Sequence, residues 1–140
     1  MKYVLSEGTL TLPEAVQDQS ITIFRLPKTR ATLVVTRAWD VKEGEEENYL
    51  QQQLAKVKRD MKKFAAQETE ETLFGELSAR EVAMRFENQG VTVVQKLLIA
   101  KTETHLMMLT FSRAGTFDAD SLAAWQVIKS GFIPSAGAEA

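Results

Sequence analysis

The sequence predicts an α+β domain, an antiparallel sheet flanked by helices. Two strong strands joined by a short turn lie near the N-terminus, and further strands with short polar joins follow in the second half of the chain. Such short joins connect antiparallel neighbours. Two segments with the apolar spacing of a helix interrupt and then end the series of strands. Each helix must bury its apolar stripe, so we expect both to pack on the sheet.

Four strands are expected in the N-terminal part of the chain. Each is a short run of apolar or β-branched residues, and glycine, proline or charged residues separate the runs. The last two form a hairpin, because only a short turn joins them. The expected strands are 3–5, 9–12, 20–26 and 31–39, with a loop over 13–19 and a turn over 28–30.

The strand over 20–26 has two apolar faces. Ile21 and Ile23 point to one side, because strand side chains alternate. Thr22 and Phe24 point to the other side, so both faces are apolar or only weakly polar. A core can cover one face, and the second face needs another cover. The nature of that second cover is the main functional question that the sequence raises.

The segment 45–64 is the best helix candidate. Its apolar residues recur at steps of four and three, the period of a buried helical stripe. Acidic residues at its start and basic residues towards its end complement the helix dipole, and the simplest interpretation of these charges is a solvated outer face. The stripe is Leu50, Leu54, Val57, Met61 and Phe64, the acidic residues are Glu45, Glu46 and Glu47, and the basic residues are Lys56, Lys58, Arg59, Lys62 and Lys63.

The second half of the chain returns to strands and closes with a helix. The strands join through short polar turns, the pattern of an antiparallel meander, but their order in the sheet stays open. Asp118 or Asp120 can cap the last helix, which runs to about Ser130. The expected strands are 72–77, 80–88, 91–101 and 105–113, with turns at 78–79, 89–90 and 102–104. The inner stripe of the helix is Leu122, Trp125, Ile128 and Phe132.

Length and composition limit the class of protein. The 140 residues suit a single domain, expected over 1–134, with a flexible C-terminal tail over 135–140. The net charge of -2 argues against nucleic acid or anionic lipid as the main partner. No signal-peptide core and no apolar run of roughly 20 residues is present. We therefore expect a cytoplasmic protein without direct membrane insertion.

The sequence contains no recognised catalytic or cofactor motif. It has no cysteine, and its single histidine, His105, is interpreted as a strand-end residue rather than a metal ligand. Phosphate-binding loops, nucleophile elbows and dinucleotide fingerprints are absent. The acidic residues at 45–46 and 68–71 lie in solvated segments, whereas acid catalysis needs burial or a close like charge. We expect no metal, no cofactor and no enzymatic activity.

Several side chains leave two interpretations open. Gln53 lies beside the helical stripe, either as a boundary residue that faces water or as an amide that hydrogen-bonds a docked partner. Thr32 and Thr36 pose the same choice on their strand. Met107 and Met108 are either core residues or part of an adaptable binding surface.

The stretch Pro13–Pro27 carries a family resemblance. Its sequence, PEAVQDQSITIFRLP, resembles the N-terminal signature of the DcrB-related proteins, and among them the effector-associated (Eag) chaperones of bacterial type VI secretion. A looser resemblance extends through the 31–37 strand, the 49–61 helix, the later strands and the last helix. It covers most of the chain.

The resemblance implies a fold and a function. The fold would be a PsbP-like α/β sandwich, usually a homodimer. Chaperones of this kind hold the hydrophobic N-terminal transmembrane helices of a toxin effector in the cytoplasm, and they shield these helices until the effector is loaded onto the VgrG spike. The partners would be the effector and, through it, VgrG, and the family is not enzymatic.

By position, the resemblance also implies the residues that bind the effector helices. A glutamine on a later strand matches Gln95, although gap-free matching points to Lys96. Phe24 and Leu26 would face the core. The implied binding residues are Ile21, Ile23, Thr32, Val34, Thr36, Gln53, Val57, Met61 and Gln95.

Two other functions stay open. One is a different non-enzymatic binding or regulatory module of the same fold, with a soluble or small-molecule partner. The other is an enzyme with a nonstandard site, for which the sequence offers no acidic cluster. A neighbouring gene for a transmembrane toxin or a VgrG-like spike would favour the chaperone.

Overall fold

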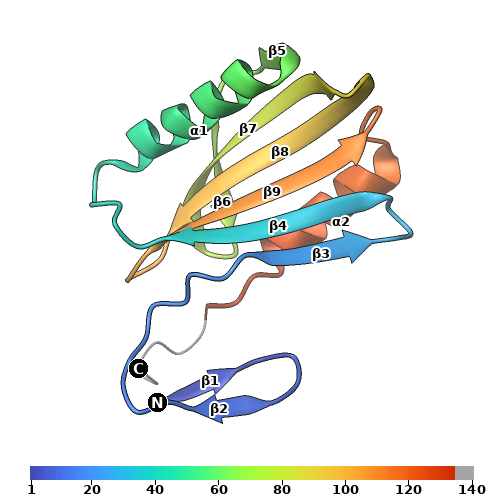
Figure 1. The fold of residues 1–140 in the computed structure, drawn as a ribbon. Coiled ribbons are helices and arrows are strands. Elements are labelled where there is room, and N and C mark those ends of the chain that lie inside the picture. The colour runs from blue at the N-terminus through green and yellow to red at the C-terminus, as the bar shows by residue number, and fades with distance from the viewer. Residues whose placement is uncertain (135–140) are drawn as a thin grey trace.

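A seven-stranded antiparallel sheet with a helix on each face forms the body of the protein (Figure 1). The computed structural model describes residues 1–134, so the predicted tail over 135–140 lies outside the described residues. The strands are β1 (Lys2–Val4), β2 (Thr9–Thr11), β3 (Thr22–Leu26), β4 (Ala31–Ala38), β5 (Lys62–Ala66), β6 (Glu70–Phe74), β7 (Leu77–Asn88), β8 (Val91–Lys101) and β9 (Leu106–Ala114). The helices are α1 (Glu46–Asp60) and α2 (Ala119–Ser130).

The strand order of the sheet is β3-β4-β9-β8-β7-β5, and β6 also pairs with β7. All pairs are antiparallel, which confirms the predicted α+β class. The last strand of the chain, β9, lies between β4 and β8. β3 is an edge strand with a single neighbour, so one side of its backbone has no partner strand in the described chain.

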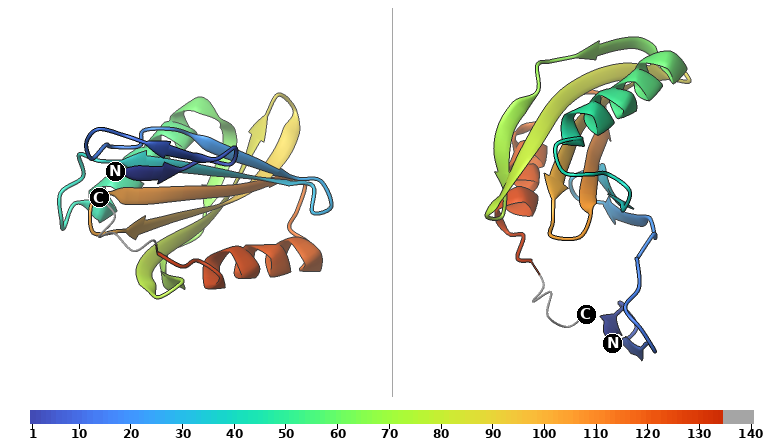
Figure 2. Two further views of the ribbon diagram at one scale, coloured as in Figure 1. Left: turned by 90° about the horizontal axis from the view of Figure 1, so that it is seen from below. Right: turned by 90° about the vertical axis from the view of Figure 1, so that its left-hand side faces the viewer.

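β1 and β2 form a separate hairpin, which Figures 1 and 2 show below the main sheet. Lys2 pairs with Thr11 and Val4 with Thr9. The ammonium group of Met1 donates to the carbonyl oxygen of Leu12 at 2.9 Å. The two short N-terminal strands were expected, and they pair with each other rather than with the main sheet.

Side-chain alternation along β4 divides the sheet into two faces. Leu33 and Val35 are buried on the side of α2, and Thr32, Val34 and Thr36 are half-buried on the side of α1. Two core clusters follow from this division. Leu50 of α1 packs with residues of β7, β8 and β9 on one face. Trp125 of α2 packs with residues of β4, β8 and β9 on the other.

α1 is shorter than the predicted helix. It ends at Asp60, where Met61 takes an extended backbone conformation, and the chain continues as β5. The pairing of β5 with β7 is irregular between Lys62 and Ala65. Phe64 therefore lies in a strand, yet it packs against the same cluster as Leu50. The helical spacing of apolar residues continues beyond the end of α1 because α1 and β5 both cover the core cluster around Leu50.

The first turn of the meander lies earlier than predicted. Gly75 has a φ of 61°, a conformation that favours glycine, and the chain turns at 75–76. Ser78 and Ala79, expected in a turn, lie within β7 instead. A Cβ atom at Gly75 would also collide with the carbonyl oxygen of Phe132. Glycine is required here both by the backbone and by the close approach of the C-terminal segment.

The inner side of α2 differs from its predicted stripe. Leu122 is 42% exposed, whereas Ser121 and Lys129 are buried together with Trp125. Ser121 caps the helix with Asp118, whose carboxylate accepts from the Ser121 backbone N–H at 2.8 Å. Trp125, Ile128 and Phe132 pack against the core as predicted, so only Leu122 was misplaced. Ser121 and Lys129 were missed because they are polar residues with internal partners, which hydrophobicity alone does not reveal.

Candidate binding surface

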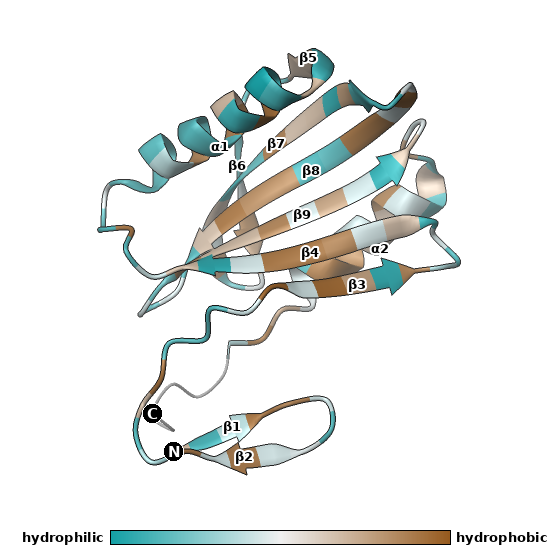
Figure 3. Ribbon diagram, viewed as in Figure 1, coloured by the Kyte–Doolittle hydropathy of each residue, from teal (hydrophilic) through white to brown (hydrophobic). Residues whose placement is uncertain are grey.

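One strip of the sheet has no helix on the side of α1. α1 lies over β7, β8 and the start of β9, while the rest of β9, β4 and β3 carry no helix on this side in the described chain (Figures 1 and 2). Figure 3 shows hydrophobic residues along β3 and β4 and a largely hydrophilic α1 on the other side of the sheet's middle strands. We call this surface the open strip. Its side chains on the strands are Ile23, Thr32, Val34, Thr36, Met108, Thr110 and Ser112. Ile21, which immediately precedes β3, is counted with this surface.

The strand register aligns these side chains across the sheet. Ile23 on β3 lies opposite Val34 on β4. Thr32 lies opposite Ser112 on β9, and Ser112 lies opposite Gln95 on β8. Residues directly opposite each other share one face of an antiparallel pair. The open strip therefore runs from the edge strand to Gln95.

The edge strand and the residue before it supply the most exposed apolar side chains of the open strip; β3 begins at Thr22, so the predicted strand over 20–26 is two residues shorter than expected. Ile21 is 65% exposed and Ile23 is 59% exposed. Phe24 lies opposite Leu33 on the side of the core around Trp125, as expected, although it is 52% exposed. Leu26 packs against the core on the side of α2, as expected. An edge strand has only one neighbour, and this leaves most of β3 without cover on either face.

The remaining predicted site residues border the open strip. Gln53 is half-buried on α1. Val57 and Met61 are half-buried and pack against the core cluster beneath α1. Gln95 lies on the same face as the open strip, whereas Lys96 points to the side of α2. The fold thus gathers on one face residues from β3, β4, α1 and β8 that are distant in sequence.

Sequence reasoning left the role of Met108 open and did not assign the other side chains that β9 contributes to this surface. Thr110 and Ser112 lie on the open strip between β4 and β8. Met108 lies beside Thr36 on the same face, while Met107 packs against the core on the side of α2. Only the strand order could have revealed these residues, because β9 follows β8 in the chain but also pairs with the distant β4.

Polar groups are interspersed among the aliphatic side chains of this surface. The hydroxyl oxygen of Thr36 is buried and has no hydrogen-bond partner among residues 1–134. Hydroxyl and amide groups can hydrogen-bond the backbone or polar side chains of a docked segment. The polar residues are Thr32, Thr36, Thr110 and Ser112 on the strip, with Gln53 and Gln95 at its border.

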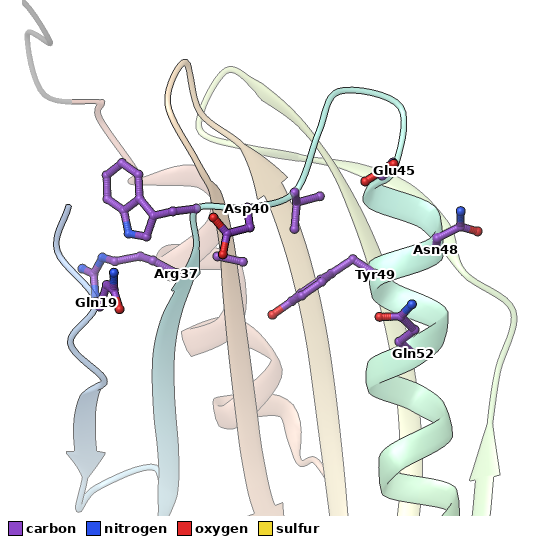
Figure 4. A pocket seen from close by; sticks show the side chains of 10 residues that line it. Gln19, Arg37, Asp40, Glu45, Asn48, Tyr49 and Gln52 are labelled. Atoms are coloured by element: carbon purple, nitrogen blue, oxygen red, sulfur yellow. The ribbon is translucent and has the colours of Figure 1, made fainter.

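A polar pocket of about 600 Å³ lies at the end of the open strip where β4 ends and α1 begins (Figure 4). Carboxylate, amide and phenol groups from the loop and from α1 surround it. The guanidinium of Arg37 donates to the carbonyl oxygen of Ser20 at 3.3 Å. The pocket is lined by Gln19, Arg37, Ala38, Trp39, Asp40, Val41, Glu45, Asn48, Tyr49 and Gln52.

An aromatic contact closes the same end of the sheet. The indole Nε1 of Trp39 donates to the carbonyl oxygen of Asp18 at 2.9 Å, and its ring centroid lies 4.2 Å from that of His105. Burial lowers the pKa of His105, and the charges of Arg37 and Lys101 act in the same direction. This site therefore favours a neutral imidazole.

A comparison with protein families assigns the chain. The family model of DcrB matches residues 7–131. The chain belongs to the DcrB family. No curated protein matches this DcrB-family sequence. Within residues 1–134, no helix is long and apolar enough to cross a membrane, and no group of three or more His, Cys, Asp or Glu residues is placed to hold a metal ion.

One solved structure agrees with the fold of this DcrB-family chain over almost its whole length. It is similar to the crystal structure of PA94, a protein of unknown function from Pseudomonas aeruginosa with a suggested regulatory role. The two are 21% identical with a TM-score of 0.77, and the match covers 96% of each chain. LpqN, involved in cell envelope biogenesis of Mycobacterium tuberculosis, matches at 18% identity with a TM-score of 0.46, over 78% of this chain and 67% of LpqN.

Proposed function

We propose that this DcrB-family chain is an effector chaperone and loading adaptor of bacterial type VI secretion. It binds the N-terminal transmembrane helices of a toxin effector in the cytoplasm, shields them from water and promotes loading of the effector onto the VgrG spike. It acts as a homodimer, without a cofactor and without enzymatic activity. The observation that carries this proposal is the open strip, with Ile21 and Ile23 uncovered beside small hydroxyl and amide side chains.

The open strip offers apolar surface to a helix that has left the membrane. Covering apolar area stabilises a contact by roughly 25 cal/mol per Å². Ile21 and Ile23 are 65% and 59% exposed, so a docked helix would remove both from water while its own apolar side chains are covered. Such cover stabilises a client in water, because an isolated transmembrane helix cannot bury its own apolar side chains.

The dimensions of the surface suit a transmembrane helix. β4 has eight residues and extends about 26 Å at roughly 3.3 Å per residue. α1 has 15 residues and extends about 22 Å at roughly 1.5 Å per residue. A membrane span of about 20 helical residues is roughly 30 Å long. The open strip and α1 can therefore flank most of its length.

The polar residues give the surface the character of a helix contact within a membrane. Small side chains such as Thr32 and Ser112 permit close approach of a docked helix. The amides of Gln53 and Gln95 can hydrogen-bond polar side chains that transmembrane helices bury against one another. An aliphatic surface with such groups fits a transmembrane client better than a uniformly apolar one.

Two substitutions, one immediately before β3 and one within β3 on the side of α2, test the proposal. Ile21→Asp places a charge on the open strip, and Phe24→Asp places the same charge on the other face, at positions 65% and 52% exposed. Each variant is co-expressed with the N-terminal transmembrane region of a type VI effector from the same genome. We expect the effector region to co-purify with F24D and to be lost with I21D.

Gln53→Arg should behave like I21D, because it brings a long charged side chain to the border of the open strip. Circular dichroism establishes that each variant is folded. Normal co-purification of the effector region with folded I21D and folded Q53R would rule out the open strip as the binding surface.

A second candidate function is a binding or regulatory module with a small polar ligand. The polar pocket beside Tyr49 favours it, because carboxylate, amide and phenol groups converge there. Under this function, Tyr49→Ala abolishes ligand binding while I21D has no effect. I21D therefore separates the two functions, because it abolishes effector binding under the first and leaves ligand binding unchanged under the second.

A further inference from the structure

Acidic side chains occupy one end of the open strip. This end contains the polar pocket, where β4 stops and α1 begins (Figure 4). Asp40 and Glu45 line the pocket and are exposed. Arg37, the cationic residue of the pocket lining, donates to the Thr22 hydroxyl of β3 at 3.5 Å and to the carbonyl oxygen of Ser20 just before β3. The pocket therefore presents carboxylate and amide oxygens at the end of the open strip.

Basic side chains occupy the opposite end. Arg25 lies on the open-strip face of β3, opposite Thr32 at the start of β4. Lys28 and Arg30 follow in the turn between β3 and β4, and Lys56 lies in the second half of α1. All four cations are exposed. The surface between β3 and α1 therefore has an acidic and a basic end.

Ion pairs at the two ends of α1 establish its direction along the sheet. Glu47 in the first turn pairs with Arg80 near the start of β7 at 2.7 Å. Lys63, just after the helix, pairs with Glu87 near the end of β7 at 3.2 Å. α1 thus begins over the end of the sheet where β4 stops, and it ends over the side where β4 starts (Figure 1).

The helix dipole does not account for the whole charge pattern. It favours acidic residues at the start of α1 and basic residues at its end. Asp40 lies in the loop before the helix and Arg25 lies on β3, so the same polarity extends beyond α1. Near the basic end, the guanidinium of Arg59 and the carboxylate of Asp60 form an ion pair at 3.0 Å, so their charges offset each other. The polarity belongs to the surface as a whole.

We infer that this polarity sets the direction in which a client transmembrane helix lies on the open strip, an inference that rests on the proposed function. Transmembrane helices carry an excess of Lys and Arg at one flank. That flank lies at the pocket end, where Asp40 and Glu45 pair with it. The flank without basic residues lies beside Arg25. Charge thus selects one of two orientations that the apolar contact alone leaves equivalent.

Two synthetic peptides test the direction. Both contain the same apolar segment of leucine, alanine and glycine, and they carry a lysine pair either at the N-terminal or at the C-terminal flank. A nitroxide label beside the lysines broadens nearby backbone amide signals in NMR spectra of the full chain. We expect the label of both peptides to broaden residues 38–49 more than residues 25–32. Because the lysines are at opposite flanks of the two peptides, this result means that the two peptides bind in opposite directions.

Charge variants test the residues. The double variant D40K/E45K should bind both peptides about four-fold more weakly, because each of the two exposed ion pairs contributes roughly two-fold. Adding Arg25→Glu and Lys56→Glu to it should move the label to the opposite end of the strip. The control E68K/E76K changes the same number of exposed carboxylates outside the open strip, and it should leave affinity and direction unchanged.

The outcomes separate the inference from the function on which it rests. Binding with equal broadening at both ends, or a direction that ignores the lysines, overturns the inference and leaves the proposed function standing. Failure of both peptides to bind refutes the proposed function, and the inference falls with it.

Discussion

Replacing Lys129 by methionine should remove several kcal/mol of stability. The ammonium group of Lys129 donates to the carboxylate of Glu81 at 2.7 Å, and the indole of Trp125 donates to the same carboxylate at 3.1 Å. Glu81 is only 9% exposed and Lys129 only 8%. In K129M the carboxylate stays buried with Trp125 and the more distant Lys96, at 3.9 Å, as its remaining partners.

The size of the effect follows from burial. Removing one partner of a buried ion pair costs about 3–5 kcal/mol, because the other charge is left in a poorly solvated site. The entropy of unfolding at the melting temperature is roughly 0.3 kcal/mol/K for a chain of this length. We therefore expect the melting temperature of K129M to fall by about 10–17 °C. The lower end is favoured because Trp125 keeps its hydrogen bond.

The pair between Arg80 and Glu47 provides a matched control. Its atoms are also 2.7 Å apart, but its side chains are 45% and 42% exposed. R80M should therefore cost less than about 1 kcal/mol. Urea unfolding, followed by tryptophan fluorescence and far-UV circular dichroism, gives the free energy of unfolding for both variants and the wild type.

A double variant checks the cause. In E81Q/K129M the glutamine oxygen can still accept from the Trp125 indole, and no buried charge remains, so about half of the loss or more should be recovered. Equal losses for K129M and R80M, or a double variant no more stable than K129M, would refute the reasoning that a buried, unpaired carboxylate causes the loss.

Two further changes have expected outcomes. Thr36→Val keeps the side-chain shape and removes a buried hydroxyl without a partner among residues 1–134, so the free energy of unfolding should rise by about 1 kcal/mol; a decrease in urea unfolding would show that the hydroxyl is paired. The pKa of His105 is lowered in the folded protein by burial and by neighbouring cations, so the unfolded chain binds more protons there and stability rises with pH through about pH 6.5. The melting temperature should fall between about pH 7.5 and about pH 5.5, and H105Q should reduce this slope; an unchanged slope in H105Q would exclude the histidine as its source.

Local patterns predicted most elements of the fold, and their errors have local causes. The alternation over Ala31–Ala38 and the helical period around Leu50 were correct because each element buries one face. The helix was extended over Phe64 because that residue covers the same core from a strand. Lys129 was missed on the inner side of α2 because its partner, Glu81, lies far away in the sequence.

The sequence alone determined the antiparallel α+β class, the two apolar faces of the strand at Ile21 and Ile23, and the charge gradient along α1, because these depend on residues within one element. Only the tertiary structure decided that β9 lies between β4 and β8, so that Thr110 and Ser112 join Thr32 on one surface. It also decided that α1 covers β7 and β8 and leaves the isoleucines exposed. Strand order depends on pairing between distant segments, which periodicity within a segment does not encode.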